Sequence, residues 1–393
     1  STYPFDAFSE QLDISASSKG IEHGIEFLSP VLIWPHYCRQ ASDKKLSSTT
    51  ELRDDDQNLY PAPDHCVADA DVAIHCGDLT EESKLHEFKT ALQTLQSVRA
   101  PLKLVIAGNH DFTLDIPAFK RKLSAIDPPL DDALVKREYG NFGEARALLE
   151  SEEAKAAGIH LLDEGTHTFQ LANGSTLTVF ASPYTCSLSA DGGFQYRPDE
   201  EHEWPLQPGT DIAITHSPPL GVLDRTGDGK RAGSPSLFAA VASARPQVHC
   251  FGHIHESWGA KKIHWREEAA AADSSPPTHF TSIDNDRSLL IESLARMTVK
   301  PTDTVETKSE KETRVAAYTA NGHCSAASGH EIQAGAQTLF VNAAIEGSEE
   351  GMQQFPWLVD IKLPRTVVSS DSDKGRPSKK RKRAGERLGS AVT

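Results

Sequence analysis

The chain has 393 residues, 38% hydrophobic and 24% charged, which is an ordinary composition for a globular protein. Its formal net charge of -16 argues against broad, non-specific binding to nucleic acid. No apolar run is long enough to cross a bilayer and no signal peptide is visible, so we expect no membrane partner and an intracellular protein, cytoplasmic or nuclear. The 17 histidines are many for this length and favour metal binding or acid–base chemistry.

The N-terminal part of the chain carries no clear pattern, and we expect an irregular segment over residues 1–65. The longest apolar run there, Phe27–Trp34, is interrupted by Pro30. From Ala68 on the pattern is regular. Strands are predicted at Asp71–Cys76 and Leu102–Ile106, with an amphipathic helix at Ser83–Val98 between them. A strand–helix–strand unit of this kind predicts a parallel pair of strands.

The remaining elements follow the same alternation. Gly143–Ala157 predicts a helix, and Asn173-Gly174 predicts a hairpin turn. Further elements are predicted at His160–Leu162, Asp211–Thr215, Pro235–Ala244, Val248–Phe251, Thr338–Ala343 and Trp357–Leu363. We therefore expect one domain over 66–365, with a largely flexible insertion at about 262–334 that holds at most one helix, Leu289–Met297. Residues 366–393 form a basic tail that is disordered by composition.

Polar side chains with metal-binding chemistry follow four of the predicted strands. They are Asp78 in CGD, Asn109, His110 and Asp111 in GNHD, His216 in THSPP, and His253 and His255 in GHIH. Because the carboxyl ends of parallel strands meet at one edge, we expect these side chains to converge. A mixed set of carboxylate, amide and imidazole ligands suits Mn, Fe, Zn or Ni better than Ca or Mg.

The order GD, GNHD, a single His after a strand, and GHxH resembles the calcineurin-like metallophosphoesterase family. The stretches IHCGDLT, THSPPLGVLD and FGHIHESWG are similar to its metallophosphoesterase-domain-containing branch, whose members act on cyclic nucleotides and model diesters. The resemblance implies an α/β fold, an αββα sandwich of two mixed β-sheets flanked by helices. It also implies a phosphodiesterase that acts on a small phosphodiester or nucleotide.

The resemblance further implies two divalent transition metal ions, with Mn favoured, and a role for each motif. Asp78 would bridge the two ions. The second ion would be bound by Asn109, His216 and His253, and the first by His255. A metal-bridging hydroxide would attack the phosphorus. His110 would protonate the leaving alkoxide, and Asp111 would orient His110.

One family motif is not recognisable in this chain. The family opens with Asp-x-His after its first strand, and both residues bind the first metal. Here the nearest counterpart is Asp43, with Lys45 in place of the histidine, and no convincing strand leads to His36. We expect either an N-terminus that is spliced, truncated or mispredicted, or a protein whose first metal site is weakened.

Two other functions are compatible with the sequence. The first is a metal- or nucleotide-binding protein on a catalytically weakened scaffold, which the missing motif favours. The second is a nuclear nuclease, which the basic run Lys379–Arg383 favours and the acidic body opposes. That run is also typical of a segment bound by a nuclear-import receptor, and any nucleic-acid contact is expected to use this tail.

Overall fold

The computed structural model describes residues 26–33, 69–189, 191–200, 202–267, 276–326, 331–344 and 354–364. Asp43 and the basic run Lys379–Arg383 lie outside these residues. Within them, no helix is both long and apolar enough to span a membrane.

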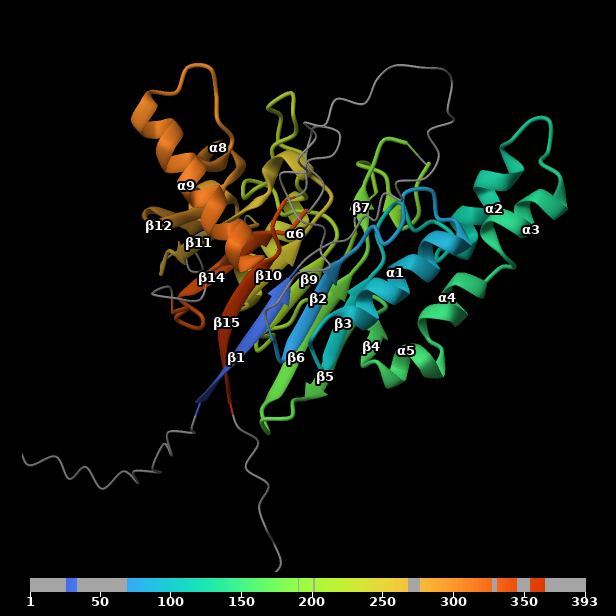
Figure 1. Ribbon diagram of the computed structural model, residues 1–393, viewed down its shortest axis with the longest axis horizontal. Coiled ribbons are helices and arrows are strands. Elements are labelled where there is room, and N and C mark those ends of the chain that lie inside the picture. The colour runs from blue at the N-terminus through green and yellow to red at the C-terminus, as the bar shows by residue number, and fades with distance from the viewer. Residues whose placement is uncertain are drawn as a thin grey trace, which may run out of the picture.

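Two large sheets form the centre of the molecule (Figure 1). The first contains, in spatial order, β13 (Cys324–Ser325), β15 (Trp357–Pro364), β1 (Glu26–Ile33), β2 (Val72–Cys76), β3 (Leu102–Ile106) and β4 (Ile159–Leu161). The second contains β12 (Ile283–Ser293), β11 (Gly259–Trp265), β14 (Gln337–Asn342), β10 (Val248–Phe251), β9 (Ile212–Thr215), β6 (Thr176–Ser182) and β5 (Gly165–Gln170). Both sheets combine parallel and antiparallel pairs.

Apolar side chains fill three layers around these sheets. Between the sheets, residues such as Ile74 and Leu104 of the first pack with Val179 and Ile214 of the second, all of them fully buried. The outer face of the first sheet is covered by α1 (Leu85–Ser97), α4 (Glu144–Leu149) and α5 (Glu152–Ala156). The outer face of the second is covered by α6 (Pro235–Ala244). The predicted αββα sandwich of two mixed sheets is confirmed.

Several predicted elements appear within a residue or two of their expected limits, including β2, β3, α1, α6 and β10. The expected helix over Gly143–Ala157 is instead two helices, α4 and α5. The break has a local cause, because the Ser151 side chain accepts a hydrogen bond from the Ala154 amide and starts a new helix.

The expectation of an irregular segment over residues 1–65 is wrong at Glu26–Ile33, which forms β1, an inner strand of the first sheet. This strand pairs antiparallel with β15 over its full length but parallel with β2 only over Val31–Ile33. Pro30 therefore faces no β2 residue, and a proline without a ladder partner on one side is tolerated in a strand. The strand β1 therefore forms because it pairs with the distant β15, and the local sequence does not encode that pairing.

The segment predicted as a largely flexible insertion contains regular structure in its described part. Leu289–Met297 is not one helix: it is the end of β12 followed by the short α8 (Leu294–Met297). Pairing of β12 with β11 overrides the local helix preference. The buried Glu292 carboxylate then anchors α9 (Val305–Asn321), since it accepts a hydrogen bond from Tyr318 at 2.9 Å and pairs with Arg314 at 3.3 Å.

A buried histidine in β10 predicts a pH dependence of stability. His249 is fully buried, and its Nε2–H donates to Thr215 Oγ1 at 2.9 Å, while Nδ1 has no partner among the described residues. Burial lowers the pKa of His249 from 6.5 to about 3. Below pH 6.5 the unfolded chain therefore takes up a proton that the folded chain does not, so stability falls with falling pH by about 1.4 kcal/mol per unit.

The variant His249→Leu removes this titration and keeps the site apolar. We expect its free energy of unfolding, measured by urea denaturation between pH 7 and pH 4, to depend less on pH than that of the unmodified chain. Equal slopes for the two proteins would contradict the assignment.

Candidate metal centre

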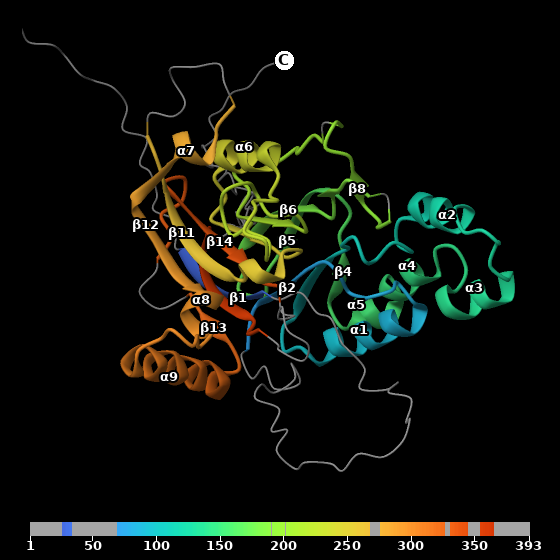
Figure 2. The same cartoon turned by 90° about the horizontal axis from the view of Figure 1, so that it is seen from above.

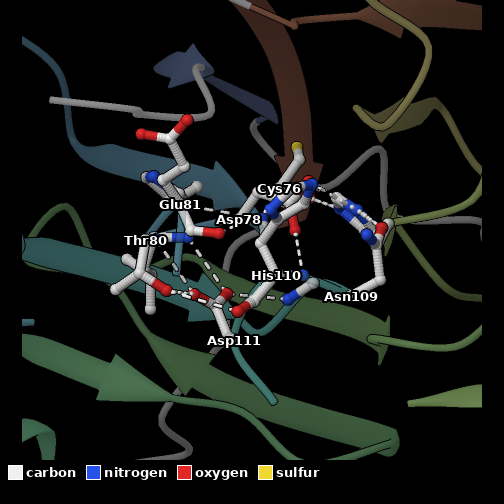
Figure 3. Close-up of polar contacts among 12 residues, drawn as sticks. Cys76, Asp78, Thr80, Glu81, Asn109, His110 and Asp111 are labelled. Atoms are coloured by element: carbon white, nitrogen blue, oxygen red, sulfur yellow. Dashed lines mark hydrogen bonds and ion pairs between the residues drawn. The ribbon is translucent and has the colours of Figure 1, made fainter. Parts of the chain in front are cut away.

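Predicted ligands from the carboxyl ends of strands in both sheets lie within contact distance of one another. Figure 3 shows those of the first sheet, Asp78 and Asn109, beside His110. Asp78 follows β2 and Asn109 follows β3 in the first sheet, while His216 follows β9 and His253 follows β10 in the second. The His216 Nε2 atom lies 3.1 Å from Asp78 Oδ2 and 3.0 Å from Asn109 Oδ1. Asp78, Asn109 and His216 thus meet, and they come from the edges of two sheets rather than one.

The backbone at these strand ends turns in ways that few residues permit. Asp78 and His253 both have positive φ, at 57° and 68°, in the left-handed region. A Cβ on Gly108 would collide with the Asp78 side chain, and one on Gly77 would collide with the His216 ring. The two glycines therefore allow the chain to approach the ligands closely.

His216 is oriented as a metal ligand would be. Its ring is fully buried, and Nδ1 lies 2.8 Å from the Cys76 carbonyl oxygen, so Nδ1–H donates to it and Nε2 points into the site. Burial by itself lowers the pKa of His216, but the Asp78 carboxylate outweighs this effect and raises it. For Asp78 the effects are reversed. Burial by itself raises the pKa of this carboxyl, but His216 outweighs burial and holds the pKa well below its usual range.

A divalent cation fits this donor set. The ligand atoms of Asp78, His216 and His253 lie within 4.8 Å of one another, close to the separation that a shared ion imposes. The His216 Nε2 atom faces two oxygen acceptors, Asp78 Oδ2 and Asn109 Oδ1, and a bound cation would satisfy all three atoms at once. Asn109 adds an amide oxygen, which gives the mixed N/O set that suits transition metals.

Asp111 does not orient His110, contrary to the prediction from the sequence. Its buried carboxylate accepts hydrogen bonds from the amides of Leu79, Thr80 and Gly108 at 2.9–3.0 Å, and from Thr80 Oγ1 at 2.7 Å. Burial raises the pKa of Asp111 to about 6, so the group is ionised at neutral pH. Its role is to tie the loop after β2 to the loop after β3.

His110 is held instead by a backbone carbonyl and by the Asp78 carboxylate. Its Nδ1 lies 2.7 Å from the Glu81 carbonyl oxygen, and its own amide donates to Asp78 Oδ1 at 2.9 Å. Partial desolvation lowers the pKa of His110, but the Asp78 carboxylate and the Glu81 carbonyl outweigh it and raise the pKa. The role of Glu81 could not be predicted from the sequence, because its contact uses a backbone carbonyl rather than a side chain. Thr80 lies directly after the GDL motif, but no role was predicted for it.

His255 is not part of this group of side chains. It begins the short 3₁₀ helix η2 (His255–Ser257). Asp43, the nearest counterpart of the missing first motif, lies outside the described residues. Among the described residues, one group of His, Cys, Asp and Glu side chains has the spacing of a metal site.

Comparisons with known proteins show which family this chain resembles. The family model of the calcineurin-like phosphoesterases matches residues 51–257, more than half of the chain. Metallophosphoesterase domain-containing protein 1 of Homo sapiens is 32% identical over 48% of this chain and 55% of its own length. A UPF0046 protein of Caenorhabditis elegans is 31% identical over 49% of this chain and 59% of its own length.

Two further matches cover a smaller share of the other protein. A probable rhamnogalacturonate lyase C of Emericella nidulans is 30% identical over 51% of this chain but only 16% of its own length. The purple acid phosphatase PPD1 of yellow lupin is a structural neighbour, with 10% identity over 64% of this chain and 42% of its own, and a TM-score of 0.31. This chain thus spans little more than half of its animal relatives. On the match to the family model, the chain belongs to the calcineurin-like phosphoesterase family.

Proposed function

We propose that this protein is a metal-dependent phosphodiesterase that hydrolyses small phosphodiesters or nucleotides. The observation that carries the proposal is the connection between His110 and the metal ligands. The amide of His110 is bound to Asp78 Oδ1, and Asp78 Oδ2 faces His216 in the candidate metal centre. An acid–base group and a cation site therefore share one carboxylate.

The chain's own residues account for binding and proton transfer. Asp78, Asn109, His216 and His253 would hold a divalent ion, with Mn favoured, and the ion would supply Lewis acidity at the phosphoryl group. With Nδ1–H donated to Glu81, the Nε2 atom of His110 remains to deliver a proton to the leaving oxygen. The raised pKa of His110 keeps a larger protonated fraction near neutral pH.

The variant His110→Ala tests the acid role. We expect turnover of a 2′,3′-cyclic nucleotide, which has an alkoxide leaving group, to fall by about 10²–10⁴-fold with added Mn²⁺. Hydrolysis of bis(p-nitrophenyl) phosphate should fall less, because nitrophenolate leaves without protonation. Mn²⁺ affinity, measured by calorimetry, should change little.

The control variant is His86→Ala, which removes an exposed histidine on α1. It should retain both activities. The proposal of an acid role for His110 fails if the two substrates lose the same factor, or if neither rate changes.

A second candidate function is a metal-binding protein with weak or no turnover. It is favoured by the single group of metal-binding side chains in the described part of the chain. Metal analysis together with rate measurement separates the two candidates: bound Mn²⁺ with turnover supports the enzyme, and bound Mn²⁺ without turnover supports the binding protein.

A further inference from the structure

The helical hairpin that follows the GNHD loop contains a cavity that the proposed function does not use. Figure 2 shows α2 (Ile116–Ser124) and α3 (Asp132–Tyr139) next to each other at one end of the molecule. Between them lies a cavity of about 790 Å³. Its apolar lining comes from Phe119, Leu123, Leu130, Val135 and Phe142.

The packing of α3 is incomplete without an occupant. No residue of this eight-residue helix is buried. Leu130, Leu134 and Phe142 are 38%, 37% and 51% exposed. A helix this short draws its stability from packing of its apolar face rather than from its own hydrogen bonds. An apolar ligand in the cavity supplies the missing contacts.

The charges at the cavity favour an anionic ligand. Lys120 and Lys136 line it together with one carboxylate, that of Asp132, and the Glu144 carboxylate outside the lining interacts electrostatically with Lys136. Lys120 Nζ lies 5.1 Å from the centre of the Phe142 ring. Neither ammonium forms a salt bridge with a carboxylate in the described part of the chain, so both are available to an anion beside the apolar lining.

We propose that this cavity binds a free alkyl carboxylate of medium chain length, about ten carbons. The alkyl chain lies between α2 and α3 against the apolar lining, and the carboxylate is bound by Lys120 and Lys136. A volume of about 790 Å³ is within the usual range of small-molecule pockets. A protein partner would bury roughly 800 Å² on this surface, which three partly exposed apolar side chains do not provide.

Calorimetric titration with decanoate and with decanol tests the proposal. The unmodified protein should bind decanoate at one saturable site, roughly tenfold more tightly than decanol, because only decanoate makes charge-assisted hydrogen bonds. In the double variant Lys120→Gln/Lys136→Gln the two ligands should bind equally. The matched control Lys308→Gln, on the exposed face of α9, should keep the tenfold difference.

Two further arms separate the alternatives. Leu123→Trp fills the cavity and should weaken both ligands, whereas Asp78→Asn should leave decanoate binding unchanged even if the proposed phosphodiesterase activity is absent. No saturable decanoate binding, or binding that the lysine variants leave unchanged, overturns the proposal. The proposal is also overturned if the protein sediments with phosphatidylserine vesicles but binds no free decanoate. That result would identify a membrane surface as the partner.

Discussion

Asp78→Asn is expected to abolish tight Mn²⁺ binding and to lower phosphodiester hydrolysis by about 10³-fold or more. The carboxylate supplies the negative charge of the candidate metal centre and faces the Nε2 atom of His216 at 3.1 Å. An amide in its place removes a full charge from the ligand set, and the Lewis acidity of a bound ion is worth several kcal/mol in the transition state. Calorimetric titration with Mn²⁺ and initial rates on a cyclic nucleotide measure the two effects.

The substitution is a mild one for the fold. Asn can accept the same hydrogen bond from the His110 amide, and it tolerates the positive φ of 57° at this position. The control Asp69→Asn removes an exposed carboxylate that pairs with Arg99. It should bind Mn²⁺ and turn over substrate as the unmodified protein does. If Asp78→Asn retains full Mn²⁺ affinity, the metal centre is not where we place it.

Asp111→Ala is expected to lower the free energy of unfolding by roughly 3–5 kcal/mol, and to lower activity as a consequence. The carboxylate accepts hydrogen bonds from three buried amides, of Leu79, Thr80 and Gly108. Without it these donors lose their partners, each at a cost of about 1–3 kcal/mol. Asp111→Asn should be destabilising as well, because its NH₂ group would face backbone donors. Urea denaturation measures both variants.

This result would distinguish two roles for Asp111. A residue that only orients the His110 ring would lose activity on substitution and keep its stability. A residue that joins two loops loses both. The control Asp115→Ala removes a nearby carboxylate that caps α2 through the Ala118 amide and also accepts from Phe194. It should cost about 1–2 kcal/mol. An equal or smaller loss for Asp111→Ala would argue against the joining role.

The sequence alone determined which residues are candidates for the metal centre. Apolar runs of four or five residues, each followed by Gly-Asp, Gly-Asn-His-Asp, His or Gly-His, identified β2, β3, β9 and β10 and the candidate ligands at their ends. These signals are local, because a buried strand and the turn after it are written in consecutive residues. The helices α1 and α6 were visible for the same reason, since their apolar positions recur at helical spacing.

Only the tertiary structure decided which edges meet and what holds them. Asp78 and His216 come from different sheets, β1 exists because the distant β15 pairs with it, and β12 exists because it pairs with β11. Asp111 is a buried acceptor that joins two loops, and the partner of His110 is a carbonyl of Glu81. Backbone acceptors and long-range strand pairs leave no mark in the local sequence, so residue types gave the ligands and only the fold gave their arrangement.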